Sequence, residues 1–176
     1  MAAQLSLFKM RKEHGGELGK GVRKEARPLS VKRPMHITVR SSWAKGDLSF
    51  LRRRNALFIK GLMRSLTARR AVTVYEMANS GNHLHLLLRT RTKDDLHGFM
   101  RELTARLSRF VTGARRGRPF GKRFFDKLYY SRIVEWGKGY KAAKNYVVQN
   151  TLEALGIVPY TPRKSRRPLA TPRAPP

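Results

Sequence analysis

The sequence predicts an α+β fold in which an antiparallel sheet of four strands packs against three helices. Four short segments alternate apolar and polar residues with the period of a half-buried strand. Three longer segments carry apolar residues at helical spacing. Their order along the chain is β-α-β-β-α-β-α, which contains two consecutive split βαβ units. This order is typical of a ferredoxin-like sandwich, with an antiparallel sheet and packed helices.

The first strand is predicted in "RPMHITVRSSW", where apolar and polar side chains alternate. One face carries Met35, Ile37 and Val39. The other face carries His36, Thr38 and Arg40. The first helix follows in "KGDLSFLRRRNALFIKGLMRSLTARR", with Asp47 as its predicted N-cap. We expect its buried stripe to be formed by Leu51, Phe58, Leu62 and Leu66.

A hairpin is predicted where "AVTVYEMAN" and "HLHLLLR" are joined by the turn "NSGN". Successive side chains of a strand point to opposite faces, so His83 and His85 share one face. The other face is a leucine surface suited to a core, formed by Leu84, Leu86 and Leu88. Two neighbouring imidazoles either hold a metal ion or pack as a partly buried pair. The pair alone does not decide between these alternatives.

The second helix is the clearest in the chain, in "TKDDLHGFMRELTARLSRFVTG". Thr92 is its predicted N-cap, two aspartates suit its first turn, and Gly113 is a natural stop. A fourth strand is predicted in "DKLYYSRIVEW" and a third helix in "GYKAAKNYVVQNTLEALG". In that last helix, we expect Val148, Leu152 and Leu155 to face the core.

Three regions are predicted along the 176 residues. Residues 1–32 are expected to be a basic flexible arm, residues 33–157 the folded domain, and residues 158–176 a disordered tail rich in proline and arginine. No apolar run is long enough to span a membrane, and we expect no membrane partner. Cysteine is absent, which excludes disulfides and cysteine-ligated zinc, and fits a cytoplasmic protein.

Charge is the strongest global signal in the sequence. There are 39 Lys and Arg residues against 11 Asp and Glu residues, a formal net charge of +28. Such an excess repels itself unless a polyanion relieves it. The expected partner is therefore nucleic acid, bound largely through its phosphates.

The last helix carries a polar group that packing does not require. Tyr146 and Asn150 are four residues apart and lie on one helical face, with Gln149 close to it. Taken alone, they describe a solvent-facing tyrosine with helix amides. Together with the histidine pair they form a pattern: the stretches "RPMHITVR", "NSGNHLHLLLR" and "AAKNYVVQN", in this order and at these separations, resemble single-tyrosine HUH transposases. The closest resemblance is to the REP-associated tyrosine transposases, which have an IS200-like transposase domain, and it covers roughly residues 33–157.

The resemblance implies a role for each matching residue. It implies that Tyr146 is the nucleophile and that His83, His85 and Asn150 bind a divalent metal, Mg²⁺ or Mn²⁺. Two imidazoles and an amide would by ligand preference suit zinc, nickel or manganese better than magnesium. Members often have proline after the Tyr-x-x-x-Asn motif and before the first histidine, whereas here Thr151 follows the motif and "SGN" precedes the histidine.

The function implied is metal-dependent nicking and strand transfer on single-stranded or hairpin-containing DNA, through a 5′-phosphotyrosine intermediate. The enzyme would act as a monomer or homodimer at the bacterial nucleoid. The alternative is a non-catalytic nucleic-acid-binding protein of ferredoxin-like fold. Supporting roles next to the site are hypothesised for His36, Glu76 and Gln149. The loop "ARRGRPFGKRFF" mixes basic and aromatic residues, and its predicted DNA contacts are Arg115, Arg116, Arg118, Lys122 and Arg123.

Overall fold

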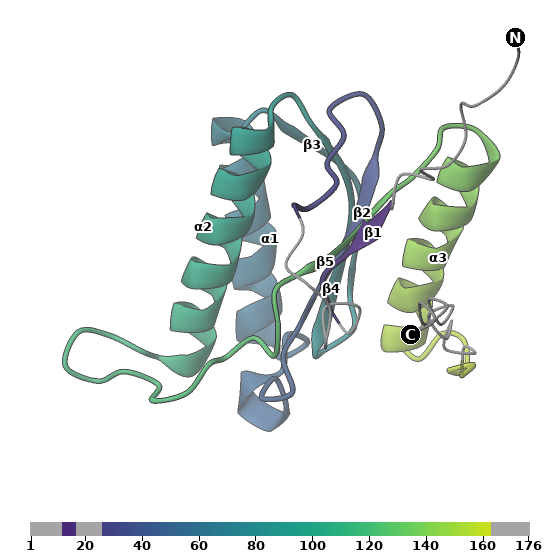
Figure 1. The fold of residues 1–176 in the computed structure, drawn as a ribbon. Coiled ribbons are helices and arrows are strands. Elements are labelled where there is room, and N and C mark those ends of the chain that lie inside the picture. Colours follow the sequence, from purple (N-terminus) through teal and green to yellow (C-terminus); the bar gives the residue numbers. More distant parts are fainter. Residues whose placement is uncertain (1–11, 17–25, 163–176) are drawn as a thin grey trace, which may run out of the picture.

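The computed structural model describes residues 12–16 and 26–162. Its sheet has five strands in the order β1-β5-β2-β4-β3, and every neighbouring pair is antiparallel. Helices α1 and α2 cover one face of the sheet, and α3 covers the other (Figure 1). The strands are β1 (Glu13–His14), β2 (Met35–Arg40), β3 (Val72–Asn79), β4 (His83–Thr90) and β5 (Tyr130–Ile133). The helices are α1 (Arg53–Arg69), α2 (Lys93–Thr112) and α3 (Lys138–Ala154).

The predicted α+β, ferredoxin-like class is confirmed. The four predicted strands stand in the order β5-β2-β4-β3, so each βαβ unit is split by a strand of the other unit. None of the described helices has the length and apolar character needed to cross a membrane.

The two faces of the sheet bury different kinds of residue. The face toward α1 and α2 holds the main core, to which β4 contributes Leu84, Leu86 and Leu88, each with no exposed area. The expected leucine surface is therefore present. On the side toward α3 there is a smaller apolar cluster, in which Ala78, Leu87 and Val134 pack against Val147 of the helix. The rest of that face is polar, which leaves room for a site.

The face of α3 that contacts the sheet differs from the prediction. Val148 is 36% exposed and Leu155 is 62% exposed, so these residues point outward rather than into the core. The buried contact is made by Val147, with Tyr140 and Ala143 packed beside it. These three residues are spaced i, i+3 and i+7, so they form one helical stripe. The sequence pattern pointed to the other face because Val148 and Leu155 are more apolar than Tyr140 and Ala143.

The start of α1 also differs from the prediction. The helix begins at Arg53, and Asp47 lies in a separate 3₁₀ turn at Gly46–Leu48. Asn55 joins the two, because its Nδ2 donates to the carbonyl oxygens of Asp47 and Ser49 at 3.0 and 2.8 Å. Leu51 precedes the helix and is 42% exposed.

Both predicted ends of α2 are confirmed. The Thr92 hydroxyl accepts a hydrogen bond from the Asp95 amide at 3.0 Å, which satisfies one donor of the first turn. Gly113 closes the helix in the left-handed conformation, with φ of 67°.

An edge strand not foreseen in the sequence lies within the predicted N-terminal arm. Residues 13 and 14 pair with β5, and Glu13 stands opposite Arg132. Arg27 supports this edge by donating to the Ser131 hydroxyl at 2.6 Å, and its guanidinium lies 3.9 Å from the centre of the Tyr129 ring. The arm therefore contributes directly to the wall of the cavity described next.

Candidate functional site

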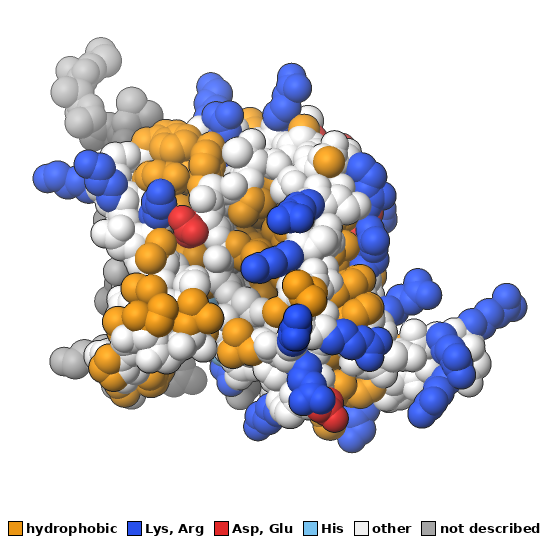
Figure 2. All heavy atoms as spheres, turned by 180° about the vertical axis from the view of Figure 1, so that it is seen from behind, with side chains coloured by type: hydrophobic (Ala, Val, Ile, Leu, Met, Phe, Trp, Pro, Cys, Tyr) orange, Lys and Arg blue, Asp and Glu red, His pale blue; other side chains and the backbone are white. Residues whose placement is uncertain are grey.

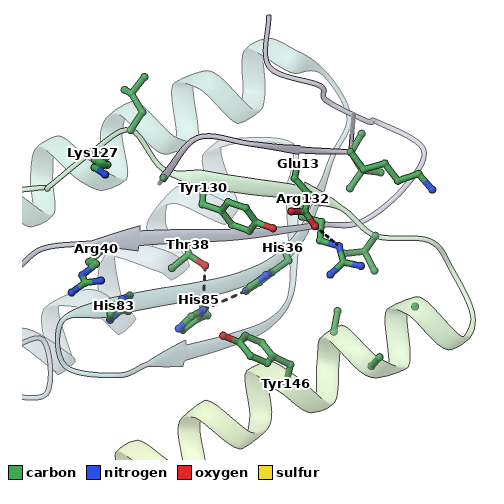
Figure 3. A pocket seen from close by; sticks show the side chains of 18 of the residues that line it. Glu13, His36, Thr38, Arg40, His83, His85, Lys127, Tyr130, Arg132 and Tyr146 are labelled. Atoms are coloured by element: carbon green, nitrogen blue, oxygen red, sulfur yellow. Dashed lines mark hydrogen bonds and ion pairs between the residues drawn. The ribbon is translucent and has the colours of Figure 1, made fainter. Parts of the chain in front are cut away.

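A cavity of about 850 Å³ lies between α3 and the polar face of the sheet (Figure 3). Side chains from β2, β4, β5 and α3 line it, together with residues of the N-terminal edge. The residues that matter for its chemistry are His36, Thr38, Arg40, His83, His85, Tyr130, Arg132 and Tyr146.

Strand register brings these residues together. Thr38 stands opposite His85 on one side and opposite Tyr130 on the other. Arg40 stands opposite His83. Because directly opposed side chains of an antiparallel pair lie about 5 Å apart, the register alone builds a continuous polar surface across three strands.

His85 is the centre of the hydrogen bonding. Its Nδ1 lies 3.2 Å from the Thr38 hydroxyl and 3.3 Å from Nε2 of His36. The His85 side chain is buried, with 6% of the residue exposed. Its ring stacks on His36 and on His83, with centroids 5.5 and 5.8 Å apart.

His83 is oriented by the hairpin turn. Its Nδ1 lies 2.6 Å from the Asn82 side-chain oxygen. The turn itself is held by Asn79, whose amide donates to the Phe50 carbonyl at 2.7 Å and accepts from the Gly81 backbone at 3.1 Å. Gly81 has φ of 82°, a conformation that a side chain would strain. The turn therefore sets the position of Asn82, which orients the ring of His83.

Tyr146 reaches into the cavity from α3, toward His85 (Figure 3). Its ring is edge-on to two histidines: the centroid lies 5.7 Å from that of His85 and 5.5 Å from that of His36. The predicted nucleophile and predicted metal-binding histidines thus share one cavity, although they are about sixty residues apart in the sequence.

His36 is neutral near physiological pH. Burial, and the nearby charge of Arg132, lower the pKa of His36 to about 4. A neutral His36 can accept at Nε2 the proton that His85 carries on Nδ1. In that tautomer, His85 directs the lone pair of Nε2 away from His36, as a metal-ligating histidine does.

His83 is also kept toward its neutral form. Burial is the main cause that lowers the pKa of His83, and Arg40 adds to it, while Asp126 acts in the opposite direction. A neutral imidazole is the form that binds a metal.

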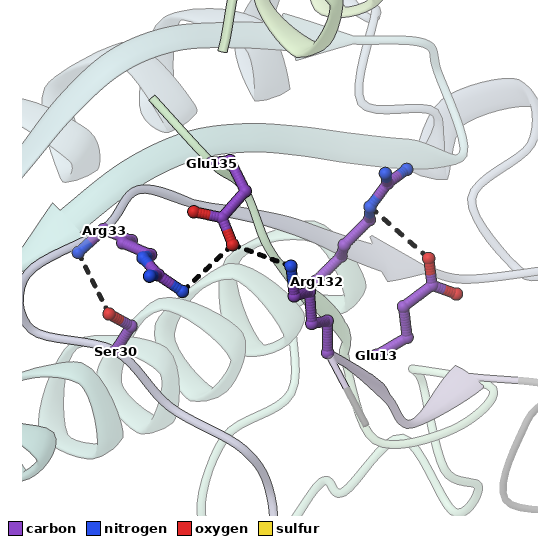
Figure 4. A network of polar contacts seen from close by, with 6 residues as sticks. Glu13, Ser30, Arg33, Arg132 and Glu135 are labelled. Atoms are coloured by element: carbon purple, nitrogen blue, oxygen red, sulfur yellow. Dashed lines mark hydrogen bonds and ion pairs between the residues drawn. The ribbon is translucent and has the colours of Figure 1, made fainter. Parts of the chain in front are cut away.

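The carboxylates at the cavity wall are matched by cations. Glu135 accepts from Lys12 at 2.7 Å and from Arg33 at 2.9 Å, and Arg132 pairs with Glu13 at 3.4 Å (Figure 4). Lys12, and then Arg33, hold the pKa of Glu135 below its ordinary value. At the other end, Arg40 pairs with Asp126 at 3.5 Å.

Three predicted residues lie away from the cavity wall. Asn150 is buried, and its Nδ2 donates to the Tyr146 carbonyl at 2.6 Å within α3. Gln149 donates to Glu153 at 2.9 Å on the exposed side of the helix. Glu76 faces α3, where Lys144 lies 4.0 Å from its carboxylate. Of the three residues hypothesised to support the site, the structure brings only His36 into the cavity.

The predicted DNA-contacting residues lie on the loop between α2 and β5, which projects from the body of the molecule (Figure 1). The five residues Arg115, Arg116, Arg118, Lys122 and Arg123 are all exposed. The loop's tip is a tight turn in which the backbones of Arg115 and Arg118 bond to each other in both directions. Figure 2 shows basic side chains along this projection.

Sequence reasoning missed several cavity residues as parts of the site. Alternation placed Thr38 and Arg40 on the same face as His36, but only the register shows that this face meets the two histidines of β4. Tyr130 and Arg132 come from a strand whose partner could not be identified by pattern. The polar face of β2 was the one feature of the sequence that could have indicated Thr38 and Arg40 as site residues.

Two of the three implied metal ligands fit a divalent ion. His83 and His85 stand side by side, and each engages Nδ1 in a hydrogen bond, which is the arrangement of histidines that ligate through Nε2. Asn150 is engaged elsewhere in α3. Within residues 12–16 and 26–162, no group of three His, Cys, Asp or Glu side chains is placed to hold a metal.

Comparisons with known proteins point in one direction. Residues 43–150 match the family model described as transposase, IS200 like. A solved structure described as the REP-associated tyrosine transposase bound to a REP hairpin has the same fold, with a TM-score of 0.59 and 13% sequence identity. The alignment covers 75% of this chain and 74% of that one. A search of curated proteins found no significant match.

Proposed function

Because the chain belongs to the IS200-like transposase family, we propose that it nicks and rejoins single-stranded DNA through a covalent bond to Tyr146. The observation that carries this proposal is the position of the Tyr146 ring, edge-on to His85 and His36 in one cavity. A tyrosine placed only for packing would not need two histidine rings beside it in a polar cavity.

The proposed step balances as a transesterification. The Tyr146 oxygen attacks a backbone phosphorus, a new P–O bond forms, and the bond from phosphorus to the 3′-oxygen breaks. The phenol loses its proton, and the departing 3′-oxygen gains one. The product is a 5′-phosphotyrosine and a free 3′-hydroxyl, and the retained bond energy allows rejoining without ATP.

The chain's own residues would orient the strand and hold charge. Arg40 and Arg132 flank the histidines on the cavity wall and can neutralise phosphate oxygens. His83 and His85 would hold a divalent ion, Mg²⁺ or Mn²⁺, with Asn150 as the proposed third ligand. When bound, the ion supplies Lewis-acid stabilisation of charge on the phosphate. For Asn150 to ligate, its side chain would have to reach into a cavity that it does not line.

DNA is the proposed partner, single-stranded or containing a hairpin. The net charge of +28 supports a polyanionic partner, and the solved neighbour is itself bound to a REP hairpin. We propose that the chain works at the nucleoid as a monomer or homodimer.

The placement of Asn150 favours a second candidate function, a non-catalytic DNA-binding protein. If its amide never leaves the Tyr146 carbonyl, the metal would lack the third protein ligand that the family resemblance implies. DNA would then bind without covalent chemistry.

The two candidates are separated by a denaturing gel of labelled single-stranded hairpins incubated with the protein and Mn²⁺. The proposed function predicts a covalent protein–DNA band that is lost in Tyr146→Phe and in His83→Ala. Tyr140→Phe is the matched control, because Tyr140 lies in the same helix but packs against Tyr75 and Trp136. DNA binding without any covalent band would support the second candidate and contradict the first.

A further inference from the structure

Trp43 is a surface tryptophan beside the catalytic cavity that the proposed chemistry does not use. It lies in the turn after β2, and 40% of the residue is exposed. Single exposed aromatic residues are common, so exposure alone assigns no role. Its surroundings are what distinguish it.

The indole of Trp43 is held rigidly. It packs edge-on against Phe120 at 5.8 Å between centroids, and Phe120 packs against the buried Phe124 at 6.0 Å. The preceding residues anchor the turn: the Ser41 hydroxyl donates to the Phe124 carbonyl at 2.5 Å, and Ser42 donates twice to Asp126, at 2.7 and 2.8 Å. A rigid aromatic surface loses little conformational entropy when it binds a ligand.

A cation accompanies the ring. The ammonium of Lys122 lies over one face of the Trp43 ring, 4.7 Å from its centre, so a base would stack on the opposite face. Lys122 belongs to the basic loop between α2 and β5, and it is not among the described residues that form ion pairs with carboxylates. An aromatic ring next to a cation on a basic loop is how proteins bind a nucleobase together with its phosphate.

The turn adjoins the cavity. Asp126, which holds Ser42, also pairs with Arg40 and lines the cavity wall near His83. A strand that left the cavity past Arg40 would reach the turn that carries Trp43. A base in a duplex already has stacking partners on both sides, so an unpaired base is the suitable occupant.

We propose that Trp43 is a stacking site for an unpaired nucleobase of the DNA strand as it leaves the cavity, with Lys122 on the adjoining phosphate. Phe124 of the basic loop offers no ring for stacking, because it is 5% exposed and lies in the core. The inference rests on the proposed function, since it takes the same single strand as ligand.

Tryptophan fluorescence tests the proposal, because the chain has two tryptophans of similar exposure. Trp136, 47% exposed, lies beyond the other end of β5, where its indole donates to the Lys32 carbonyl. The variant Trp136→Phe leaves Trp43 as the reporter, and Trp43→Phe leaves Trp136. Each is titrated with oligothymidylate at low salt, and with inorganic polyphosphate as a polyanion without bases.

We expect oligothymidylate to quench Trp43 saturably, to leave Trp136 unchanged, and to bind roughly 5- to 150-fold more weakly to Trp43→Ala. Polyphosphate should bind without quenching. Equal quenching of both tryptophans, or of Trp43 by polyphosphate, would overturn the proposal. Quenching that persists in Tyr146→Phe while no substrate gives a covalent band would refute the proposed function alone, and a covalent band without quenching would refute only the stacking site.

Discussion

At the scale of single residues, the site depends on which nitrogen of each histidine carries a proton. Thr38 and His36 both face Nδ1 of His85, and Asn82 faces Nδ1 of His83. These contacts direct both Nε2 atoms to the cavity. If His36 were protonated, its Nε2–H would face the Nδ1–H of His85, and the two donors could not form a hydrogen bond. The arrangement therefore requires His36 to stay neutral.

This requirement makes stability depend on pH through His36. The pKa of His36 is lowered to about 4 in the folded protein, against 6.5 in the unfolded chain. As pH falls below 6.5 the unfolded chain takes up the proton first, so stability is lost between pH 6.5 and about 4. The full shift corresponds to about 3 kcal/mol at most.

We expect His36→Asn to flatten the pH dependence of unfolding over this range. Urea unfolding at pH 7.5 and pH 4.5 gives the change in unfolding free energy with pH for each protein. A general loss of stability in the variant is present at both pH values and therefore cancels in this change. The same decrease on acidification in both proteins would show that His36 is not the group responsible.

Part of this residue-level picture could be predicted from the sequence. The pairing of His83 with His85, and the polar face of β2, follow from strand alternation. That His36 approaches His85 does not follow, because it depends on the register of two strands separated by a helix and another strand. Trp43 was not predicted as a site either, since its neighbours Phe120 and Lys122 lie in a loop far along the chain.

At the scale of elements, α3 carries the proposed nucleophile, Tyr146, and makes only a small apolar contact with the sheet. Its buried contact with the sheet is centred on Val147, next to Tyr146. Sequence pattern predicted the helix but chose the wrong apolar face, because most of the sheet surface that it covers is polar and gives the helix only a narrow buried stripe. The ends of α2 were predictable because capping is local chemistry.

We predict that Val147→Ala impairs catalysis out of proportion to its effect on stability. Loss of two buried methyl groups should cost about 2 kcal/mol. A small displacement of Tyr146 should in addition slow covalent adduct formation by roughly tenfold or more. The measurement is the initial rate of adduct formation, beside urea unfolding.

Val111→Ala is the matched control for this prediction. Val111 is buried in the main core on α2, on the other face of the sheet. Its loss should lower stability similarly and leave the adduct rate unchanged. Equal slowing by both variants would indicate that overall stability, rather than the seating of α3, limits the reaction.

At the scale of the whole molecule, the charge is distributed over many surfaces, and only part of it is expected to touch DNA. Basic residues occur on α1 as well as on the projecting α2–β5 loop (Figures 1 and 2). Composition predicts a polyanionic partner, because the net charge of +28 can be counted without knowing the fold. It does not predict which cations make contact, which depends on the position of the cavity.

The salt dependence of DNA affinity distinguishes basic residues that contact DNA from those that only add to the net charge. Replacing Arg115, Arg116 and Arg118 by Gln should lower the slope of log affinity for single-stranded DNA against log salt by about 2. Replacing Arg53, Lys60 and Arg64, all exposed on α1, removes the same charge and should leave the slope nearly unchanged. Equal slopes for the two triple variants would contradict a contacting role for the loop.

The central claim, that Tyr146 forms the covalent bond to DNA, is tested most directly by mass spectrometry of the adduct. Trypsin is expected to release the peptide of residues 145–163, which contains both Tyr146 and the exposed Tyr160. After nuclease trimming, we expect fragmentation to place the nucleotide on Tyr146. A nucleotide on Tyr160 or on any other residue, or an unmodified peptide from a reaction that cleaves DNA, would contradict the account.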